Sequence, residues 1–151
     1  MTTATFRTIK KSIDINAPKS RVWDVLTDDK YTRQWYSEFS PGTYADTDWK
    51  VGSDAKFLDH QQDGLIARIV TNKPAEELSM TFIGMSDKGK EVFYGPFVDA
   101  FKDKFETYKL REHHGITTLD ISTEMSEDYY DEMSQRWESA LQILKNLAES
   151  K

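Results

Sequence analysis

The chain has 151 residues, a formal net charge of −6, no cysteine, and four Trp, seven Tyr and eight Phe. The length suits one domain with a proper core, the aromatic content argues against disorder, and the absence of cysteine excludes disulfides and thiolate metal sites. A nucleic-acid partner is disfavoured because phosphate backbones require a basic face. No apolar run reaches the roughly 18 residues of a membrane span, and positions 1–13 lack the apolar segment of a secretory signal. We therefore expect one cytoplasmic domain over residues 1–151.

The first part of the chain predicts a strand followed by two short helices. Apolar residues alternate toward the end of 5–15, which is typical of a strand. Pro18 then favours a first helical position, in a helix that runs to about Thr27. Asp28 and Asp29 indicate a second helix, N-capped by Asp, from 29 to 35 or 36.

The middle of the chain predicts an antiparallel meander of short strands. Turn signals separate candidate strands at 43–45, 55–60, 65–72, 77–84, 105–112 and 116–125. This spacing differs from alternating strand–helix units. The last strand alternates most cleanly, with Leu119 and Ile121 on one face and Asp120 and Ser122 on the other. A half-covered antiparallel sheet shows such a pattern.

Residues 87–104 interrupt the meander. The segment is long for a hairpin connection and carries Phe93, Tyr94, Phe97 and Phe101. A short helix is expected over 98–104. Long loops with their own apolar side chains are often functional covers, so we expect a lid. The alternative is that the segment simply packs down on the surface.

The last stretch, 126–151, predicts one long amphipathic helix. Met133, Trp137 and Leu141 recur at helical steps on one stripe, and the opposite side is polar. Ser126 and Asp128 are candidate N-caps. A rod of about 33 Å cannot hide its stripe against itself. It requires a broad apolar partner, which the predicted sheet supplies.

Five stretches carry a family resemblance: INAPKSRVWDVLTD at 15–28, TRQWY at 32–36, DWKVGS at 48–53, ETYKL at 106–110 and WESALQILK at 137–145. With the order of elements, they resemble the helix-grip fold of the START-like (SRPBCC) superfamily. The local match is to bacterial proteins similar to the C-terminal domain of the Hsp90 ATPase activator. The resemblance implies an α+β fold in which a long helix lies across a curved antiparallel sheet, over an apolar cavity. Members bind lipids, hormones or other hydrophobic molecules, some catalyse cyclisation or dehydration, and others bind chaperones.

Ten side chains are candidates for a ligand cavity between the last helix and the sheet. Such sites are mostly apolar with a few placed polar groups. The alternative is that the rings fill the interior themselves. The candidates are Trp35, Tyr36, Phe57, Phe82, Phe97, Phe101, Tyr108, Met133, Trp137 and Leu141.

Polar candidates are fewer. Tyr36, Arg68, Thr107 and Arg136 could orient a ligand, and Glu106 and Asp59 are acid–base candidates by position. We assign no catalytic residue, because no family-wide one exists to carry over. His113 and His114 are adjacent at the end of a strand and point apart, so we expect no metal site. No cofactor is expected, since no glycine-rich phosphate loop is present.

We expect a binding protein rather than an enzyme, holding a small hydrophobic or aromatic molecule with residues 87–104 as the gate. The resemblance offers two alternatives: a module that interacts with an Hsp90-type chaperone ATPase, or a cyclase- or hydrolase-like enzyme in the same cavity. We expect a monomer or a homodimer paired through exposed aromatics such as Tyr94 and Phe97, with no membrane and no nucleic-acid partner.

Overall fold

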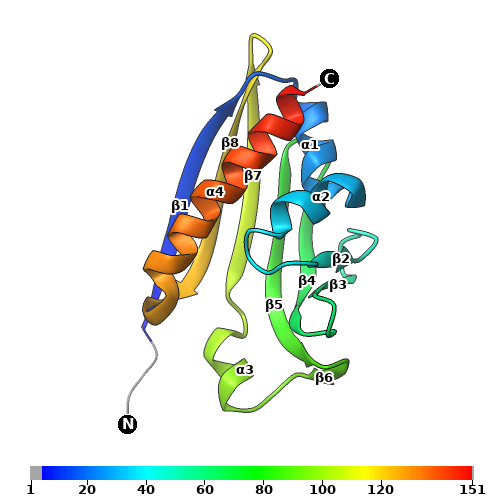
Figure 1. Ribbon diagram of the computed structural model, residues 1–151, viewed down its shortest axis with the longest axis vertical. Helices are drawn as coiled ribbons and strands as arrows, with labels where there is room; N and C mark the ends of the chain where they lie inside the picture. The colour runs from blue at the N-terminus through cyan, green and yellow to red at the C-terminus, as the bar shows by residue number, and fades with distance from the viewer. Residues whose placement is uncertain (1–4, 151) are drawn as a thin grey trace.

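The long C-terminal helix lies diagonally across one face of a curved sheet, and two short helices sit beside it on the same face (Figure 1). The structure, a computed structural model, describes residues 5–150. It confirms the predicted α+β helix-grip architecture. None of the helices in the described part of the chain is long and apolar enough to cross a bilayer.

Eight antiparallel strands form one sheet, in the order β1-β8-β7-β5-β4-β3-β2, with β6 paired to β5 off this path. The first strand closes the meander by pairing with the last one, from Phe6 opposite Ser126 to Ile15 opposite Thr117. The strands are β1 (Phe6–Ile15), β2 (Tyr44–Asp46), β3 (Asp54–Leu58), β4 (Gly64–Lys73), β5 (Glu77–Asp87), β6 (Lys90–Val92), β7 (Phe105–His113) and β8 (Ile116–Ser126).

The register of β4 against β5 shifts between Ile66 and Ala67 and again between Ile69 and Thr71. Such bulges bend a strand and increase its local twist. They therefore help the sheet to curve around the helix that covers it.

The helices are α1 (Lys19–Thr27), α2 (Asp29–Tyr36), α3 (Pro96–Phe101) and α4 (Tyr130–Glu149), with a 3₁₀ turn η1 (Glu127–Tyr129) before α4. Pro18 is the N-cap of α1 and not its first helical residue. Asp28 caps α2 as predicted, because its carboxylate accepts a hydrogen bond from the Lys30 N–H at 3.1 Å.

The predicted side-chain caps of α4 are wrong. Neither Ser126 nor Asp128 caps the helix, because the 3₁₀ turn intervenes and Tyr129 occupies the N-cap position without a side-chain hydrogen bond. Asp131 and Glu132 still place negative charge in the first turn, where the helix dipole favours it.

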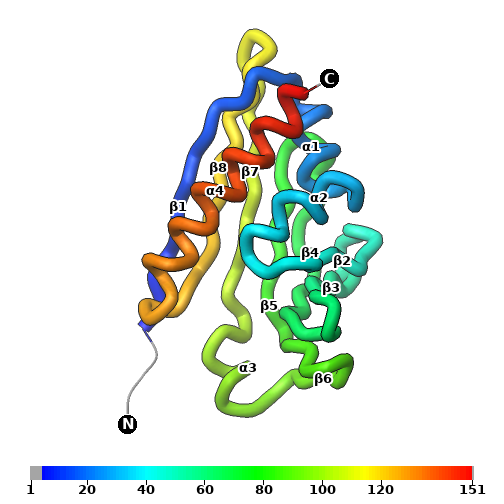
Figure 2. Tube along the Cα trace, viewed as in Figure 1, coloured from blue at the N-terminus to red at the C-terminus, as the bar shows by residue number. Residues whose placement is uncertain are grey.

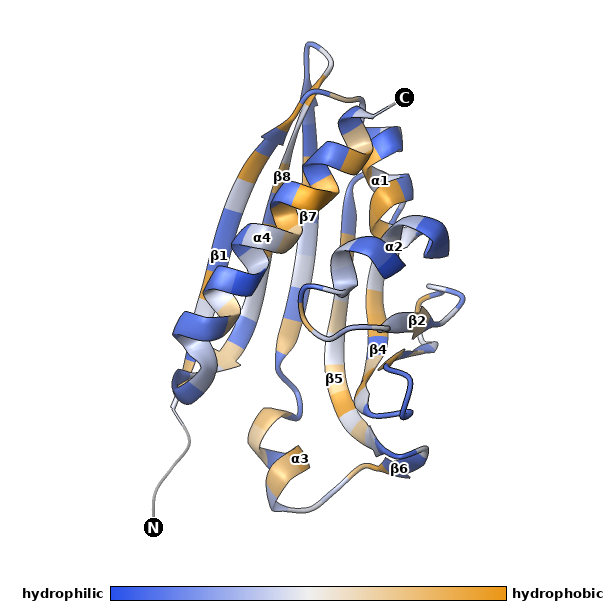
Figure 3. Cartoon of the chain, viewed as in Figure 1, coloured by the Kyte–Doolittle hydropathy of each residue, from blue (hydrophilic) through white to orange (hydrophobic). Residues whose placement is uncertain are grey.

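The apolar stripe of α4 is buried against the sheet over Trp137, Ala140, Leu141, Leu144 and Ala148. Figure 3 shows that apolar positions gather in the C-terminal half of this helix, while its first turns are hydrophilic. The apolar periodicity of the sequence therefore correctly predicts which side of the helix faces the sheet.

The C-terminal end of α4 is held by Arg21 on α1. Its guanidinium donates to the carbonyl oxygens of Leu147, Ala148 and Ser150, at 2.9, 3.3 and 3.2 Å, and to the Tyr31 hydroxyl at 2.6 Å. The last carbonyls of a helix have no partner within the helix. Arg21 supplies donors to two of these carbonyls and to the one just beyond them, and so joins α1 to α4.

The insert at 87–104 contains β6 and α3, and it folds back at the end of the sheet away from the C-terminus (Figure 2). The helix begins at Pro96, two residues before the predicted start, and ends at Phe101. The reason is local, because Pro suits the first turn and Gly95 before it has a φ of 110° that favours glycine. Val98 is buried, whereas Tyr94 and Phe97 are 79% and 65% exposed.

Candidate functional site

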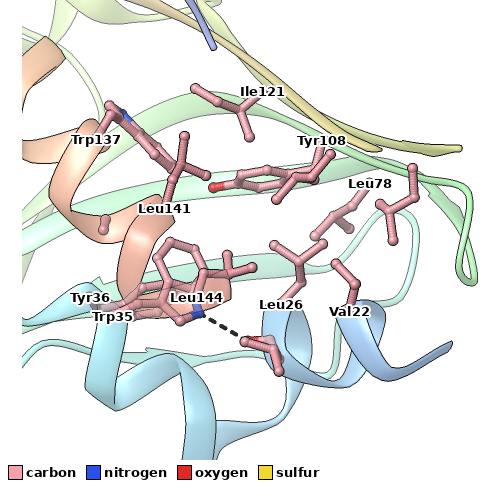
Figure 4. Close-up of a cluster of buried hydrophobic side chains, with 14 of the residues drawn as sticks. Val22, Leu26, Trp35, Tyr36, Leu78, Tyr108, Ile121, Trp137, Leu141 and Leu144 are labelled. Carbon is pink, nitrogen blue, oxygen red and sulfur yellow. Dashed lines mark hydrogen bonds between the residues drawn. The ribbon is translucent and has the colours of Figure 1, made fainter. Parts of the chain in front are cut away.

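Five aromatic side chains from four elements meet beneath α4. Trp35 packs on Tyr36 with ring centroids 4.5 Å apart, and on Trp137 at 6.1 Å. Tyr108 lies 6.1 Å from Trp137, and Phe57 lies 5.9 Å from Tyr36. Figure 4 shows Tyr108 reaching from the sheet between Trp137 and the pair on α2. These rings form one continuous aromatic wall, which we call the interior site.

The other candidates for the cavity divide between two places. Leu141 is buried in the same core, and Met133 lies half-buried at its edge. Phe82 and Phe97 each pack on Phe101, with ring centroids 6.4 and 5.7 Å apart. These three rings belong to the end of the sheet that carries α3.

One aromatic neighbour of the interior site is absent from the candidates. Phe39 packs edge-on against Trp137, with ring centroids 4.9 Å apart. It follows α2 and lies in an irregular segment, where no periodicity predicts which way a side chain faces. Its closeness to Trp35 in the sequence was the available signal.

A polar cluster lies in the interior site. On β7, Glu106, Tyr108 and Leu110 are every second residue, so Glu106 shares the inward face of the other two. The Tyr108 hydroxyl donates to Glu106 Oε2, and the Thr123 hydroxyl donates to Glu106 Oε1 at 3.1 Å. Glu106 and Thr123 are register partners across β7 and β8. Both carboxyl oxygens are thus held by hydroxyl groups.

The charge of Glu106 is not balanced by a cation. No lysine or arginine in residues 5–150 forms an ion pair with it. Burial raises the pKa of the Glu106 carboxyl, and the hydrogen bonds from Tyr108 and Thr123 offset part of that rise. Burial disfavours the charged form of an acid. The carboxyl is therefore shifted toward its neutral form.

The pKa values of both tyrosines of the site are affected by Glu106. Burial first, and then the charge of Glu106, raise the pKa of the Tyr36 hydroxyl and of the Tyr108 hydroxyl. Glu106, Tyr36 and Tyr108 are therefore close enough to interact electrostatically. Both phenols are protonated and can donate hydrogen bonds at physiological pH.

The Tyr36 hydroxyl is the open member of this cluster. The residue is 7% exposed, and the side-chain hydrogen bonds of residues 5–150 include none from its hydroxyl. No side-chain hydrogen bond within residues 5–150 therefore holds the Tyr36 hydroxyl, although the residue is buried.

Asp59, the other acid–base candidate, lies outside the interior site. Its carboxylate accepts hydrogen bonds from the backbone N–H groups of Gln61 and Asp63, at 2.9 and 3.1 Å. It stabilises the turn between β3 and β4. Sequence position therefore identified two candidates, and only Glu106 lies among the aromatic rings.

Three further polar candidates have other partners. Arg68 is exposed and lies 3.6 Å from Asp54. Thr107 faces the outer surface of the sheet, because it alternates with the inward-facing neighbours on β7. Arg136 donates to the Glu38 carbonyl oxygen at 2.8 Å and so ties α4 to the segment after α2. In residues 5–150, no group of three or more His, Cys, Asp or Glu could hold a metal ion.

The chemistry available here is that of a weak acid and two phenols inside an aromatic wall. Burying a carboxyl group that has no cation beside it is unfavourable. Titratable groups with shifted pKa values, placed among apolar side chains, are typical of sites that bind or transform small molecules.

Comparison with solved structures finds the same fold in several bacterial proteins. CalU16 from Micromonospora echinospora is 21% identical, with a TM-score of 0.68 over 95% of this chain and 76% of that chain. Protein MLL2253 from Mesorhizobium loti is 18% identical, with a TM-score of 0.70 over 93% and 96%. The Aha1 dimer from Colwellia psychrerythraea is 16% identical, with a TM-score of 0.69 over 95% and 96%. At these identities the likeness concerns the fold.

No curated protein matches the sequence. A family model matches residues 16–149, which is most of the chain and includes every residue of the interior site. The chain therefore belongs to the family described as activator of Hsp90 ATPase homolog 1-like protein.

Proposed function

We propose that this protein binds a small hydrophobic or aromatic molecule in the interior site, between α4 and the sheet, with residues 87–104 as the gate. The carrying observation is the Glu106 carboxyl, which hydroxyl groups hold in a wall of aromatic rings. Folding alone gains little from an acid there, since an apolar side chain of similar volume avoids the desolvation cost. A role in binding a ligand that contacts the polar cluster would explain why an acid is present there.

Ligand entry requires side chains to move. The rings of the interior site contact one another, so a guest must separate them. Met133 and Phe101 are partly buried at the edge of the core, and methionine adapts its shape easily. We propose that these two side chains move aside as the gate opens. Burial of apolar ligand area, at roughly 25 cal/mol per Å², drives binding.

Tryptophan indole N–H signals in nuclear magnetic resonance spectra test this proposal. On titration with 2-methylnaphthalene, we expect the signals of Trp35 and Trp137 to shift and saturate. Trp23 is not part of the aromatic wall, and its indole signal serves as the internal control. Uniform small shifts of all indole signals, or none, contradict the proposal. Native mass spectrometry of protein purified from its own host would show a retained guest directly.

A second candidate function is the activation of a chaperone ATPase. The observation that favours it is the family description, which names the Hsp90 ATPase. The test is an ATPase assay with the Hsp90 homologue of the same host. Stimulation at micromolar protein supports this function, and no effect at that concentration contradicts it.

The interior site also suits an enzyme of the cyclase or hydrolase type. The Glu106 carboxyl, with Tyr108 beside it, is the group that such a reaction would use as acid or base. A Glu106→Gln variant that keeps any measured turnover contradicts this role.

A further inference from the structure

The polar atoms of the interior site are not equally available to a ligand. The hydroxyl groups of Tyr108 and Thr123 are committed to the two oxygens of Glu106. The Tyr36 hydroxyl makes no such hydrogen bond within residues 5–150. Because its ring is almost fully buried, this hydroxyl can serve a guest only inside the aromatic wall.

The Tyr36 hydroxyl acts as a hydrogen-bond donor. It stays protonated because burial and the nearby Glu106 both raise its pKa. A donor left unpaired once a guest excludes water is costly, whereas a neutral oxygen that accepts from it removes that cost. Carbonyl oxygens are suitable acceptors, since they carry two lone pairs and no charge.

An anionic guest finds no counter-charge here. Lys11, on the inward face of β1, already pairs with Glu138 at 2.6 Å. Arg136 on α4 already donates to the Glu38 carbonyl oxygen. Ionised Glu106 repels a second negative charge and has no cation of its own. A carboxylate or phosphate in this site would be buried without compensation, which is strongly unfavourable.

We infer that the ligand is a neutral aromatic carbonyl compound whose oxygen accepts a hydrogen bond from Tyr36, and that fatty acids and phospholipids are excluded. The flat rings of Trp35 and Trp137 favour aromatic guests, because aromatic pairs interact beyond their simple burial. This inference rests on the proposed binding function.

Three naphthalenes of similar size separate the possibilities. The probes are 2-acetylnaphthalene, 2-methylnaphthalene and 2-naphthoate, and the readout is the dissociation constant from calorimetry at pH 8. We expect 2-acetylnaphthalene to bind about 5- to 10-fold more tightly than 2-methylnaphthalene, as one added hydrogen bond allows. We expect 2-naphthoate to bind at least about 10-fold more weakly than 2-acetylnaphthalene, owing to its buried charge.

Two variants assign the effect to its atom. Tyr36→Phe keeps the ring and removes the hydroxyl, so the preference for 2-acetylnaphthalene over 2-methylnaphthalene should disappear while 2-methylnaphthalene still binds. Tyr129→Phe, at an exposed tyrosine outside the gate and the interior site, should leave the preference unchanged. Glu106→Gln should narrow the gap between 2-naphthoate and 2-acetylnaphthalene.

The outcomes distinguish this inference from the function beneath it. Saturable binding of 2-methylnaphthalene with no preference for the ketone overturns the inference and leaves the binding function standing. A preference that survives Tyr36→Phe, or tighter binding of 2-naphthoate, also overturns it. Absence of binding by all three probes overturns both.

Discussion

At the scale of single residues, Glu106 is a carboxyl group in a position that is unfavourable for its charged form. It is held by two hydroxyl groups and balanced by no cation in the described chain. Alternation on β7 already indicated its direction, since Tyr108 and Leu110 lie on the same face. Its partner Thr123 comes from another strand, and only the register of β7 against β8 brings the two together.

The raised pKa of Glu106 predicts a pH dependence of stability. The folded state binds this proton more tightly than the unfolded state, so the stabilisation is complete below the unfolded pKa and is lost as pH rises through the higher folded pKa. Glutamine does not titrate. We therefore expect the free energy of unfolding of the Glu106→Gln variant to rise relative to that of the wild type as the pH is raised from 4 to 8.

Urea denaturation of both proteins across this pH range measures the difference between their free energies of unfolding. The contributions of the other titrating groups, which both proteins share, cancel in this difference. A difference that is constant with pH contradicts the raised pKa.

Trp137 carries a second prediction at this scale. It is 3% exposed and contacts Trp35, Phe39 and Tyr108. Trp137→Ala should lower the free energy of unfolding by about 3–5 kcal/mol, the usual cost of removing a buried aromatic ring. Tyr94→Ala, at an exposed ring, is the matched control and should cost far less. Equal losses in urea denaturation would contradict the buried position of Trp137.

At the scale of elements, α4 is both the best predicted feature and the one with the least predictable ends. Its apolar stripe follows from spacing alone. Its start does not, because the chain enters through a 3₁₀ turn after β8, and its end depends on Arg21, which lies far away in the sequence. Helix periodicity is a local property of the sequence, whereas these contacts are set by tertiary structure.

Arg21 should therefore matter more than its position on a short helix suggests. Its guanidinium donates to two carbonyl oxygens in the last turn of α4, to the carbonyl oxygen of Ser150 just beyond it, and to the Tyr31 hydroxyl. Arg21→Ala should lower the free energy of unfolding by about 2 kcal/mol, because hydrogen bonds from charged donors are worth more than neutral ones. Lysine cannot reproduce the planar fork, so Arg21→Lys should recover only part of the loss.

Arg33 provides the control for Arg21. It forms an exposed ion pair with Asp29 one helical turn away, at 2.7 Å, and Arg33→Ala should cost about 0.5 kcal/mol or less. Chemical denaturation that finds the two alanine variants equally stable would show that the contacts of Arg21 do not anchor α4.

At the scale of the whole molecule, the meander and the covering helix could be predicted, while the placement of the insert could not. Turn residues and alternation indicate the strands. The pairing of β1 with β8 joins the first strand of the chain to the last one and has no local signal. The same holds for Phe97, which is as apolar as Phe101 and packs on it one helical turn away, yet is 65% exposed.

The gate hypothesis makes its prediction at this scale. The helix α3 has six residues, with Val98 as its buried residue, so this segment should open more readily than β1 and β8, which pair over ten register positions. Hydrogen exchange followed by mass spectrometry should show faster exchange over 90–101 than over 6–15. Comparable protection of both segments would argue against a gate.

The strands at the two ends of the main strand order differ in how they discourage unwanted association. One edge is β2, with three residues, which is too short to template another strand. The other is the ten-residue β1, which carries Arg7, Lys10 and Lys11. Charged side chains and short edge strands are the usual protection against edge-to-edge aggregation. We therefore expect the charged residues of β1 to discourage pairing of this edge with a second copy of the chain.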